Sequence, residues 1–157
     1  NSDTTRCFPV NGQFTARQKE VYSAVLHCLK EGSKLLKPGI VHADYENIMA
    51  GLVEEELIKL GLLKADEVEK QDPKKPLYKK YFMHGTAHHI GLDVHDVGLY
   101  SRNIEEGMVF TCEPGIYIPE EGIGCRLEND YLITKEGNIN LTAAMPIEID
   151  EIEALMK

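Results

Sequence analysis

Histidines are concentrated in one short stretch of the chain. Residues 84–98 read His-Gly-Thr-Ala-His-His-Ile-Gly-Leu-Asp-Val-His-Asp-Val-Gly, so imidazoles are interspersed with glycines and short apolar runs. Neutral imidazole is the commonest metal ligand in proteins and can carry protons near neutral pH. The stretch therefore predicts a metal site or a proton-transfer site, with His84, His88 and His95 as candidate residues.

Two glutamates further along the chain are expected to belong to the same site. Glu113 and Glu128 each lie within an apolar run that is typical of a β-strand. Burying a bare carboxylate costs several kcal/mol or more, so each of them needs a cation or a hydrogen-bond donor. Arg126 precedes Glu128 by two positions, and on a strand the two side chains share a face, where a guanidinium can orient the carboxylate.

Other interpretations of the histidines are available. His88 taken alone fits a hydrogen-bonded structural histidine. His84 and His88 have the spacing of a zinc-binding pair on a helix, but no glutamate adjoins His84 and Gly85 weakens a helix. His89 would point away from its neighbours in an extended segment, and we assign it no role.

Two further candidates also have simpler explanations. His95 fits a surface histidine paired with Asp93 or Asp96 as well as it fits a catalytic group. Arg126 and Glu128 fit an ordinary surface ion pair. Only the combination of these residues with their neighbours favours a metal site.

Three segments together resemble one enzyme family. Residues 84–98, the Glu-Pro-Gly-Ile-Tyr-Ile of residues 113–118 and the Gly-Ile-Gly-Cys-Arg-Leu-Glu-Asn-Asp of residues 122–130 are similar to the pita-bread metallopeptidases. The closest likeness is to the branch of Xaa-Pro aminopeptidase (aminopeptidase P) and prolidase, and it runs over essentially the whole chain. The Asp-Thr-Thr-Arg-Cys-Phe-Pro of residues 3–9 matches a further family segment.

The resemblance implies a ligand set for two divalent metal ions, with Mn²⁺ ahead of Co²⁺ or Zn²⁺. The positions of His88 and Glu113 would bind one ion, and those of Asp3 and Glu128 would bridge both. A pair of metal ions can lower the pKa of a bridging water and polarise the scissile carbonyl.

The resemblance also implies catalytic roles. The carboxylate at Glu113 would accept the proton of the water, and His95 would donate a hydrogen bond to the substrate or intermediate. His84 would help to form the pocket for the residue after the scissile bond, and Arg126 would fix the bridging carboxylates. The expected activity is hydrolysis of the Xaa-Pro bond of peptides by a metal-activated water.

The expected extent of the chain follows from the same resemblance. Family members carry another metal-binding aspartate roughly ten residues before the position of Asp3, so residues 1–157 are expected to be the C-terminal part of a single catalytic domain. This part alone is expected to hold one metal ion or none and to be inactive. An apolar face left by the missing half would promote self-association into a homo-oligomer, or would need a replacement partner.

The order of predicted elements favours an α+β fold. A capping box at Thr15 and Gln18 begins a helix that Gly32 could end, and a second amphipathic helix covers residues 45–60 and ends near Gly61. A charged, irregular segment spans residues 64–80. Short strands follow at 108–112, 115–118, 125–127 and 131–134, with a hairpin turn at 119–122 and a final helix at 148–156. Helices before strands suit a curved antiparallel sheet covered by helices, as the pita-bread resemblance implies.

Composition restricts the possible partners. The chain has 157 residues, 43% of them hydrophobic, and a net charge of −9, which disfavours nucleic acid and anionic membranes as partners. Its four cysteines, Cys7, Cys28, Cys112 and Cys125, form no Cys-x-x-Cys motif and are expected to be free thiols in a reducing, cytoplasmic compartment. No signal peptide and no apolar run of transmembrane length is visible.

Two rival functions remain. A pita-bread protein that has lost its ligands would act as a non-catalytic binding module, but His88, Glu113 and Glu128 are all present. Methionine aminopeptidase or creatinase chemistry on the same fold is the second rival. The Asp-Val-His-Asp-Val-Gly run of residues 93–98 favours the prolyl branch. The motifs do not separate aminopeptidase P from prolidase.

Overall fold

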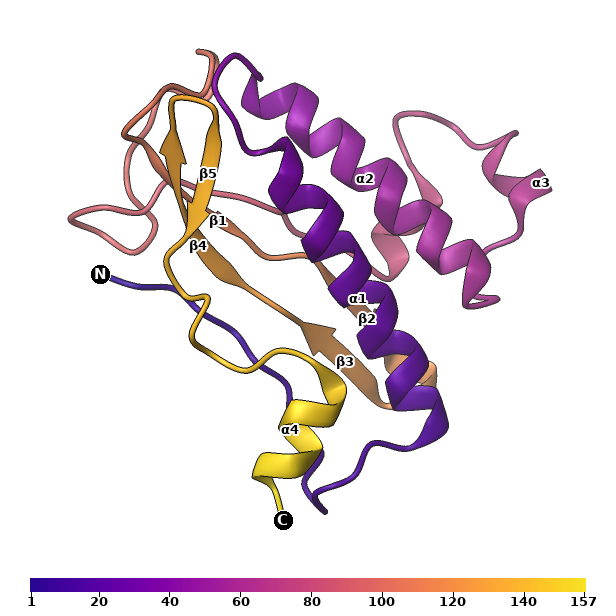
Figure 1. Ribbon diagram of the computed structural model, residues 1–157. Helices are drawn as coiled ribbons and strands as arrows, with labels where there is room; N and C mark the ends of the chain where they lie inside the picture. The colour runs from indigo at the N-terminus through magenta and orange to yellow at the C-terminus, as the bar shows by residue number, and fades with distance from the viewer.

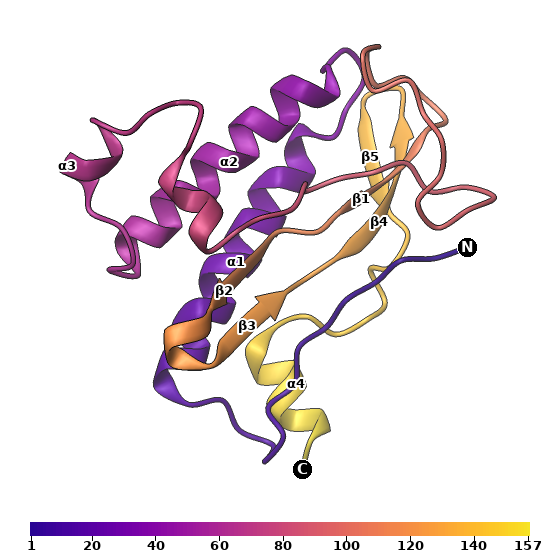
Figure 2. The same ribbon diagram turned by 180° about the vertical axis from the view of Figure 1, so that it is seen from behind.

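The computed structural model describes residues 1–157 and shows helices covering one face of antiparallel strands. Helix α1 (Ala16–Leu35) lies over the strands and packs against them, and α2 (His42–Lys59) packs beside it (Figure 1). A short α3 (Ala65–Val68), a 3₁₀ turn η1 (Leu77–Lys80) and the C-terminal α4 (Ile149–Leu155) complete the helices. Seen from behind, the strands lie in front of α1 and α2 (Figure 2). The predicted α+β class is confirmed.

The strands form two antiparallel ladders. One has the order β1 (Val109–Cys112), β4 (Asn129–Thr134) and β5 (Gly137–Asn140). The other pairs β2 (Gly115–Ile118) with β3 (Ile123–Arg126) through a 3₁₀ turn, η2 (Pro119–Glu121), at the expected hairpin. Because Cys112 pairs with Asn129 and Gly115 with Arg126, the register continues across the gap between the ladders. The two ladders are thus one long, interrupted hairpin.

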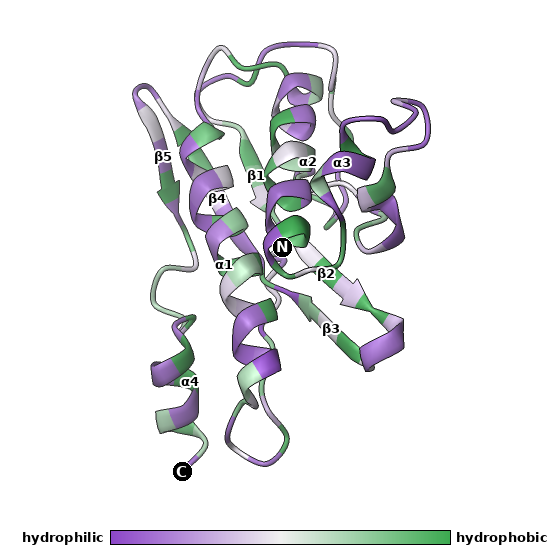
Figure 3. Cartoon of the chain, turned by 90° about the vertical axis from the view of Figure 1, so that its right-hand side faces the viewer, coloured by the Kyte–Doolittle hydropathy of each residue, from purple (hydrophilic) through white to green (hydrophobic).

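The core lies between this hairpin and the two long helices. Figure 3 shows hydrophilic and hydrophobic residues on both α1 and α2, as expected of helices with one face on a core. Tyr45 and Met49 from α2 are fully buried, as are Val25 from α1 and Phe110 from β1. The Tyr45 hydroxyl donates a hydrogen bond to the Cys112 thiol, 3.2 Å away, which ties α2 to the end of β1.

The first helix is longer than its glycine suggested. Thr15 and Gln18 form the expected capping box, but α1 continues through Gly32 to Leu35. Gly32 faces α2 instead of ending its own helix: a Cβ placed there would lie 2.5 Å from the Met49 sulfur. The interpretation of Gly32 as a helix stop was therefore wrong, because the residue meets a packing need. Gly61, with φ +74°, does follow the end of α2 as expected.

Other predicted elements agree in position, with differences at their ends. The final helix and the irregular segment at 64–80 are present, although the latter contains α3 and η1. Strand β5 was not predicted, because Gly-Asn-Ile-Asn carries no apolar alternation. All four cysteines are free, and Cys112 and Cys125 lie on strands. None of the helices combines the length and the apolar character needed to cross a membrane.

Candidate metal centre

The two glutamates lie at the interruption of the long hairpin. Glu113 directly follows β1, and Glu128 directly precedes β4. Both positions agree with the predicted strand bounds, whereas the expectation that each glutamate lies within a strand-like run was wrong. The break arises where Pro114, which has no amide hydrogen, follows Glu113. Since the register runs through the break, the two glutamates lie opposite one another.

Two segments outside the hairpin, the histidine segment and the N-terminal segment, accept hydrogen bonds from the backbone amides of the two glutamates. The amide of Glu113 donates to the carbonyl oxygen of Thr86 at 2.8 Å, and the amide of Glu128 donates to that of Thr5 at 3.1 Å. The first contact aligns His88 with the site, and the Thr111 amide also donates to the His88 carbonyl at 3.0 Å. The second contact aligns the N-terminal segment. Backbone hydrogen bonds on both sides thus place the candidate ligands around one point.

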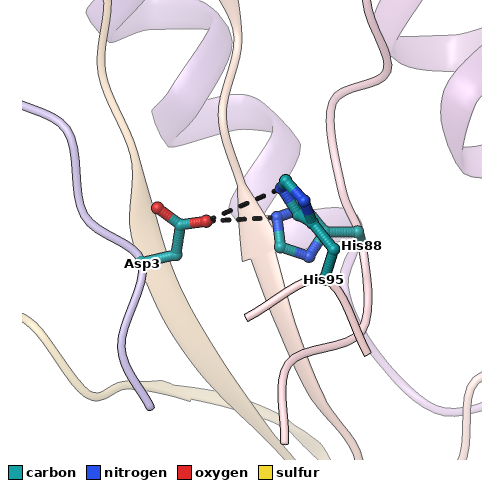
Figure 4. Close-up of side chains that lie close together, drawn as sticks. All are labelled: Asp3, His88 and His95. Atoms are coloured by element: carbon teal, nitrogen blue, oxygen red, sulfur yellow. Dashed lines mark ion pairs between the residues drawn. The ribbon is translucent and has the colours of Figure 1, made fainter. Parts of the chain in front are cut away.

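His88 lies at the centre of the acidic cluster. Its Nε2 is 3.4 Å from Asp3 Oδ2 and 3.5 Å from Glu113 Oε1. Figure 4 shows the Asp3 carboxylate pointing toward the rings of His88 and His95, and His95 Nε2 is 4.0 Å from the same oxygen. Potential ligand atoms of His88, Glu113 and Glu128 lie within 4.8 Å of one another, as do those of Asp3, His88 and His95.

The N-terminal aspartate is held in place. The Asp3 amide donates to Asp130 Oδ2 at 3.2 Å, and the Ser2 hydroxyl donates to the same oxygen at 3.0 Å. Asp130 is itself buried on β4. The aspartate is therefore fixed to β4, the strand that directly follows Glu128.

Four buried polar atoms around this point have no hydrogen-bond partner, and two of them belong to candidate metal ligands. These two atoms are His88 Nε2 and Glu128 Oε1. His88 Nδ1 is 2.9 Å from the His89 carbonyl oxygen, which can only accept, so Nδ1 carries the proton and Nε2 presents a lone pair. A lone pair facing two carboxylate oxygens is repulsive without a cation between them. The donor set therefore fits a divalent ion.

The electrostatics of the two glutamates agree with this. Burial first, and then the negative charge of Glu128, raise the pKa of Glu113 to about 7 against the opposing effects of His88 and Arg126. Burial likewise raises the pKa of Glu128, which is only 1% exposed. Two opposed carboxylates resist ionisation together, and a cation at this point would relieve both effects.

Arg126 reaches both glutamates from the edge of the site. Its Nη1 is 3.8 Å from Glu113 Oε2, and its Nε is 4.0 Å from Glu128 Oε2. Thr5 forms a link between Arg126 and Glu128, because its hydroxyl accepts from Arg126 Nε at 3.1 Å and donates to Glu128 Oε2. The guanidinium therefore acts on Glu128 mainly through a hydroxyl.

His95 and His84 are placed differently from His88. His95 is exposed, with its ring edge-on to that of His88 at 4.3 Å, and Asp96 bonds the amides of Leu92 and Val97 instead of His95. The alternative of a His95–Asp96 pair is therefore wrong.

His84 stands apart from the acidic cluster. Its Nε2 is 2.8 Å from the hydroxyl of Tyr117 on β2, and burial lowers its pKa. Residues 84–88 are not helical, so the zinc pair on a helix is excluded. His89 packs its ring against Phe110 at 4.1 Å, away from the carboxylates, and takes no part in the cluster.

Sequence reasoning missed residues that support the site. Glu46 on α2 accepts hydrogen bonds from the Thr86 amide at 2.9 Å, the Thr86 hydroxyl at 2.8 Å and the Ala87 amide at 3.1 Å. His42, also on α2, lies 2.8 Å from the Ala87 carbonyl oxygen through its Nε2. No sequence signal marks Glu46. Thr5 lies two positions after Asp3, so in an extended segment the two side chains point to the same side, and this spacing could have predicted that Thr5 lies near the site.

Comparison with known proteins identifies the family. Residues 1–135 match the model of metallopeptidase family M24, so the chain belongs to that family. It is 46% identical to the Xaa-Pro aminopeptidase of Escherichia coli K12 and 43% identical to that of Haemophilus influenzae, each over 98% of the chain. It covers 37% and 38% of those two proteins, so it spans about a third of the length of the curated relatives that it matches.

Solved structures give the same assignment. Zn-substituted E. coli aminopeptidase P in complex with product superposes with a TM-score of 0.87 at 45% identity, covering 98% of this chain and 37% of that one. The same enzyme with the inhibitor Pro-Leu matches equally well. The pita-bread fold implied by the sequence is confirmed, as is the resemblance to the aminopeptidase P branch. Metal dependence is a property of the family to which the chain belongs.

Proposed function

We propose that this chain is part of the catalytic domain of a metal-dependent exopeptidase that hydrolyses the peptide bond before a prolyl residue. The observation that carries the proposal is the convergence of Asp3, His88, Glu113 and Glu128, with His88 Nε2 and Glu128 Oε1 buried and unpartnered. The names of the relatives support the activity, and their greater length supports residues 1–157 being the C-terminal part of the domain. A non-catalytic binding module would have no need of such a costly cluster.

The donor set favours Mn²⁺ over Co²⁺ or Zn²⁺. Three carboxylates accompany a single imidazole, and oxygen-rich sets suit harder divalent ions, whereas zinc prefers nitrogen and sulfur donors. We propose that Asp3, His88, Glu113 and Glu128 hold the metal. When bound, divalent ions supply Lewis-acid polarisation of the substrate carbonyl and lower the pKa of water.

Glu113 is proposed to serve as the proton acceptor as well as a ligand. Its carboxylate lies among the ligand atoms of His88 and Glu128, so it would stand beside a water held by the metal, as a general base must. Arg126, 3.8 Å from the same carboxylate, is proposed to hold Glu113 and, through Thr5, Glu128 in position. The arginine thereby limits the motion of both carboxylates.

The two remaining histidines are proposed to contact substrate. His95 is exposed beside Asp3 and His88, so its imidazole can donate a hydrogen bond to an oxygen that develops charge during bond cleavage. His84, held by Tyr117 on β2, is proposed to line the pocket for the residue after the scissile bond.

The substrates proposed are peptides with proline in the second position. Support comes from the relatives' names and from the Pro-Leu inhibitor of the E. coli structure. A homo-oligomeric state and a cytoplasmic location, expected from the sequence, are proposals as well.

Metal removal and restoration test the proposal. The protein that carries this chain is treated exhaustively with a chelator, and Mn²⁺, Co²⁺ or Zn²⁺ is then added back separately. Hydrolysis of an Xaa-Pro peptide is expected to disappear and to return best with Mn²⁺. A matched Xaa-Ala peptide should be cleaved poorly throughout. Activity that survives exhaustive chelation would rule the proposal out.

A further inference from the structure

A second reactive cluster lies outside the acidic site and consists of two thiols. Cys7, in the N-terminal segment, and Cys125, on β3, line the same small cavity. Cys7 also lies beside β3 through its contact with the Arg126 carbonyl oxygen, 3.3 Å from its sulfur. The two cysteines thus face one cavity, and Cys7 contacts the residue that follows Cys125, although they belong to distant parts of the sequence.

A small cavity gives access to this thiol pair. It has a volume of about 120 Å³ and is lined by both cysteines together with Phe8, Phe14 and Ile123. Phe8 is 57% exposed and Gly124 is exposed, so the cavity opens at the surface. A peroxide molecule is small enough to enter it.

The thiol pair is electrostatically asymmetric. The hydrogen bond from Cys125 lowers the pKa of Cys7, against the opposing effect of burial, and the positive charge of Arg126 lowers it further. The same hydrogen bond and burial raise the pKa of Cys125. One thiol therefore has nucleophilic character and its neighbour keeps its proton.

The other two cysteines provide a contrast. Cys28 and Cys112 are fully buried, and burial raises the pKa of each to about 12. The Cys112 sulfur is occupied by a hydrogen bond from Tyr45. Neither residue lines the cavity, so the reactive features are confined to Cys7 and Cys125.

We propose that Cys7 and Cys125 form an oxidation site in which a hydroperoxide converts the two thiols into a reversible disulfide. The Cys7 thiolate attacks the terminal peroxide oxygen, the O–O bond breaks, and Cys7 becomes a sulfenic acid. The other oxygen leaves and is protonated, to water from hydrogen peroxide or to an alcohol from an organic hydroperoxide. Cys125 then attacks the sulfenic sulfur, the S–S bond forms, and the S–O oxygen leaves as water with the Cys125 proton. With hydrogen peroxide, two thiols lose two electrons and two protons, and the peroxide becomes two water molecules.

The bond would fasten the N-terminal segment to the strand hairpin. Residues 1–9 contain no helix or strand, and they carry Asp3 and Thr5 to the acidic site. A covalent link at Cys7 to β3 would restrict this segment in the unfolded chain more strongly than a short-range link, because the residues it joins are far apart in sequence. The inference does not depend on the proposed peptidase activity.

The experiment is peptide mapping after mild oxidation. The native protein is treated with hydrogen peroxide, free thiols are alkylated, and proteolytic peptides are analysed by mass spectrometry before and after dithiothreitol. The expected product is one linked pair of peptides containing Cys7 and Cys125, which separates on reduction. Cys28→Ala is the matched control and should give the same linked pair.

Two variants separate the roles of the thiols. In Cys125→Ala, Cys7 is expected to be trapped by dimedone as a sulfenic acid, and Cys7→Ala should give neither the adduct nor the linked pair. Oxidation should raise the melting temperature of the parent protein and of Cys28→Ala only. The proposal is overturned if Cys7 in the parent protein remains free while methionines oxidise, if it passes to sulfinic acid without a linked peptide, or if the link joins separate chains. Because the parent protein alone gives these results, misfolding of a variant does not affect the test.

Discussion

Glu113 shows most directly how burial changes the chemistry of a single residue. Its pKa is raised to about 7 by burial and by Glu128, so the folded, metal-free protein binds a proton there that the unfolded chain releases at lower pH. Between the unfolded pKa and pH 7 the native state holds more protons, so stability falls as pH rises. The shift corresponds to on the order of 3 kcal/mol lost across that interval.

The resulting prediction concerns the chelated protein. Its melting temperature should fall between pH 5 and pH 8, and Glu113→Gln should reduce the fall because the amide does not ionise. Glu106→Gln, at an exposed position, is the control and should leave the fall unchanged. Thermal melts followed by circular dichroism measure the effect, and addition of Mn²⁺ should restore stability at pH 8. A fall of equal size in Glu113→Gln would assign it to another group.

Alanine variants of His88 and His95 should separate loss of metal binding from loss of catalysis. His88→Ala removes a donor at the centre of both groups of ligand atoms, so metal affinity should fall by more than the ~100-fold that loss of an outer partner costs. His95→Ala removes an exposed ring at the edge, so affinity should change little while kcat falls by roughly 10²-fold, as for loss of one oxyanion donor. Isothermal titration with Mn²⁺ and steady-state kinetics separate the two effects. Equal loss of metal in both variants would make His95 a ligand.

Elements that contribute no ligand still position the site. Helix α2 holds the segment 84–88 through Glu46, whose carboxylate accepts two backbone amides and a hydroxyl. Glu46→Ala should therefore destabilise the protein by ~1–3 kcal/mol, since buried donors lose their acceptor, and should weaken metal binding through His88. Glu55→Ala, an exposed change on the same helix, should alter neither. Urea denaturation and metal titration of both variants provide the check; a neutral Glu46→Ala would mean that the segment is held by its strand contacts alone.

The contact between α1 and α2 gives a paired glycine test. Gly32 faces Met49, whose sulfur would be 2.5 Å from an added Cβ, whereas Gly51 on α2 has no neighbour within 4 Å. Alanine favours both helices by up to about 1 kcal/mol over glycine. Crowding against the buried Met49 should offset this gain at Gly32 by ~1–3 kcal/mol. Gly51→Ala should thus raise the melting temperature and Gly32→Ala should not; equal increases would show that Met49 moves aside freely.

The sequence was informative where a pattern is local. The capping box at Thr15, the glycine after α2 and the hairpin turn after β2 are set by neighbouring residues, and each was predicted. Strand β5 was not predicted, because its residues do not alternate between apolar and polar and its pairing is with β4 alone. The break at Glu113 was marked by the predicted strand bounds, which leave out Glu113 and Pro114, and the structure has the same gap between β1 and β2.

The candidate site shows the same division between local and distant information. The motifs marked Asp3, His88, Glu113 and Glu128, and the structure places them in two overlapping groups around His88. Their roles remain predictions. The acceptor at Glu46 comes from another helix and has no signature in the sequence, because only the folded chain brings α2 to the histidine segment.

Across the whole molecule, the site depends on segments that meet only after folding. The histidine segment bonds one side of the long hairpin and the N-terminal segment bonds the other, each at a glutamate. Arg6 secures the second of these contacts by donating to the Glu128 carbonyl at 2.7 Å and to Asn129 at 2.8 Å. The ligand geometry is therefore a property of the complete arrangement.

Metal stoichiometry is the prediction at this scale. Residues 1–157 provide one compact group of His88, Glu113 and Glu128, while the second group has Asp3 as its only carboxylate beside His88 and His95. Two divalent ions held close together repel each other strongly, so they need more negatively charged ligands than these two groups provide. A polypeptide of these residues alone should therefore bind a single Mn²⁺ tightly and show little or no Xaa-Pro hydrolysis. Calorimetric titration with parallel sedimentation and peptidase assays tests both expectations, and Glu128→Gln, which removes a charge from the compact group, should abolish the tight site. Two tightly bound ions per chain with full turnover would mean that these residues already form a complete dinuclear centre.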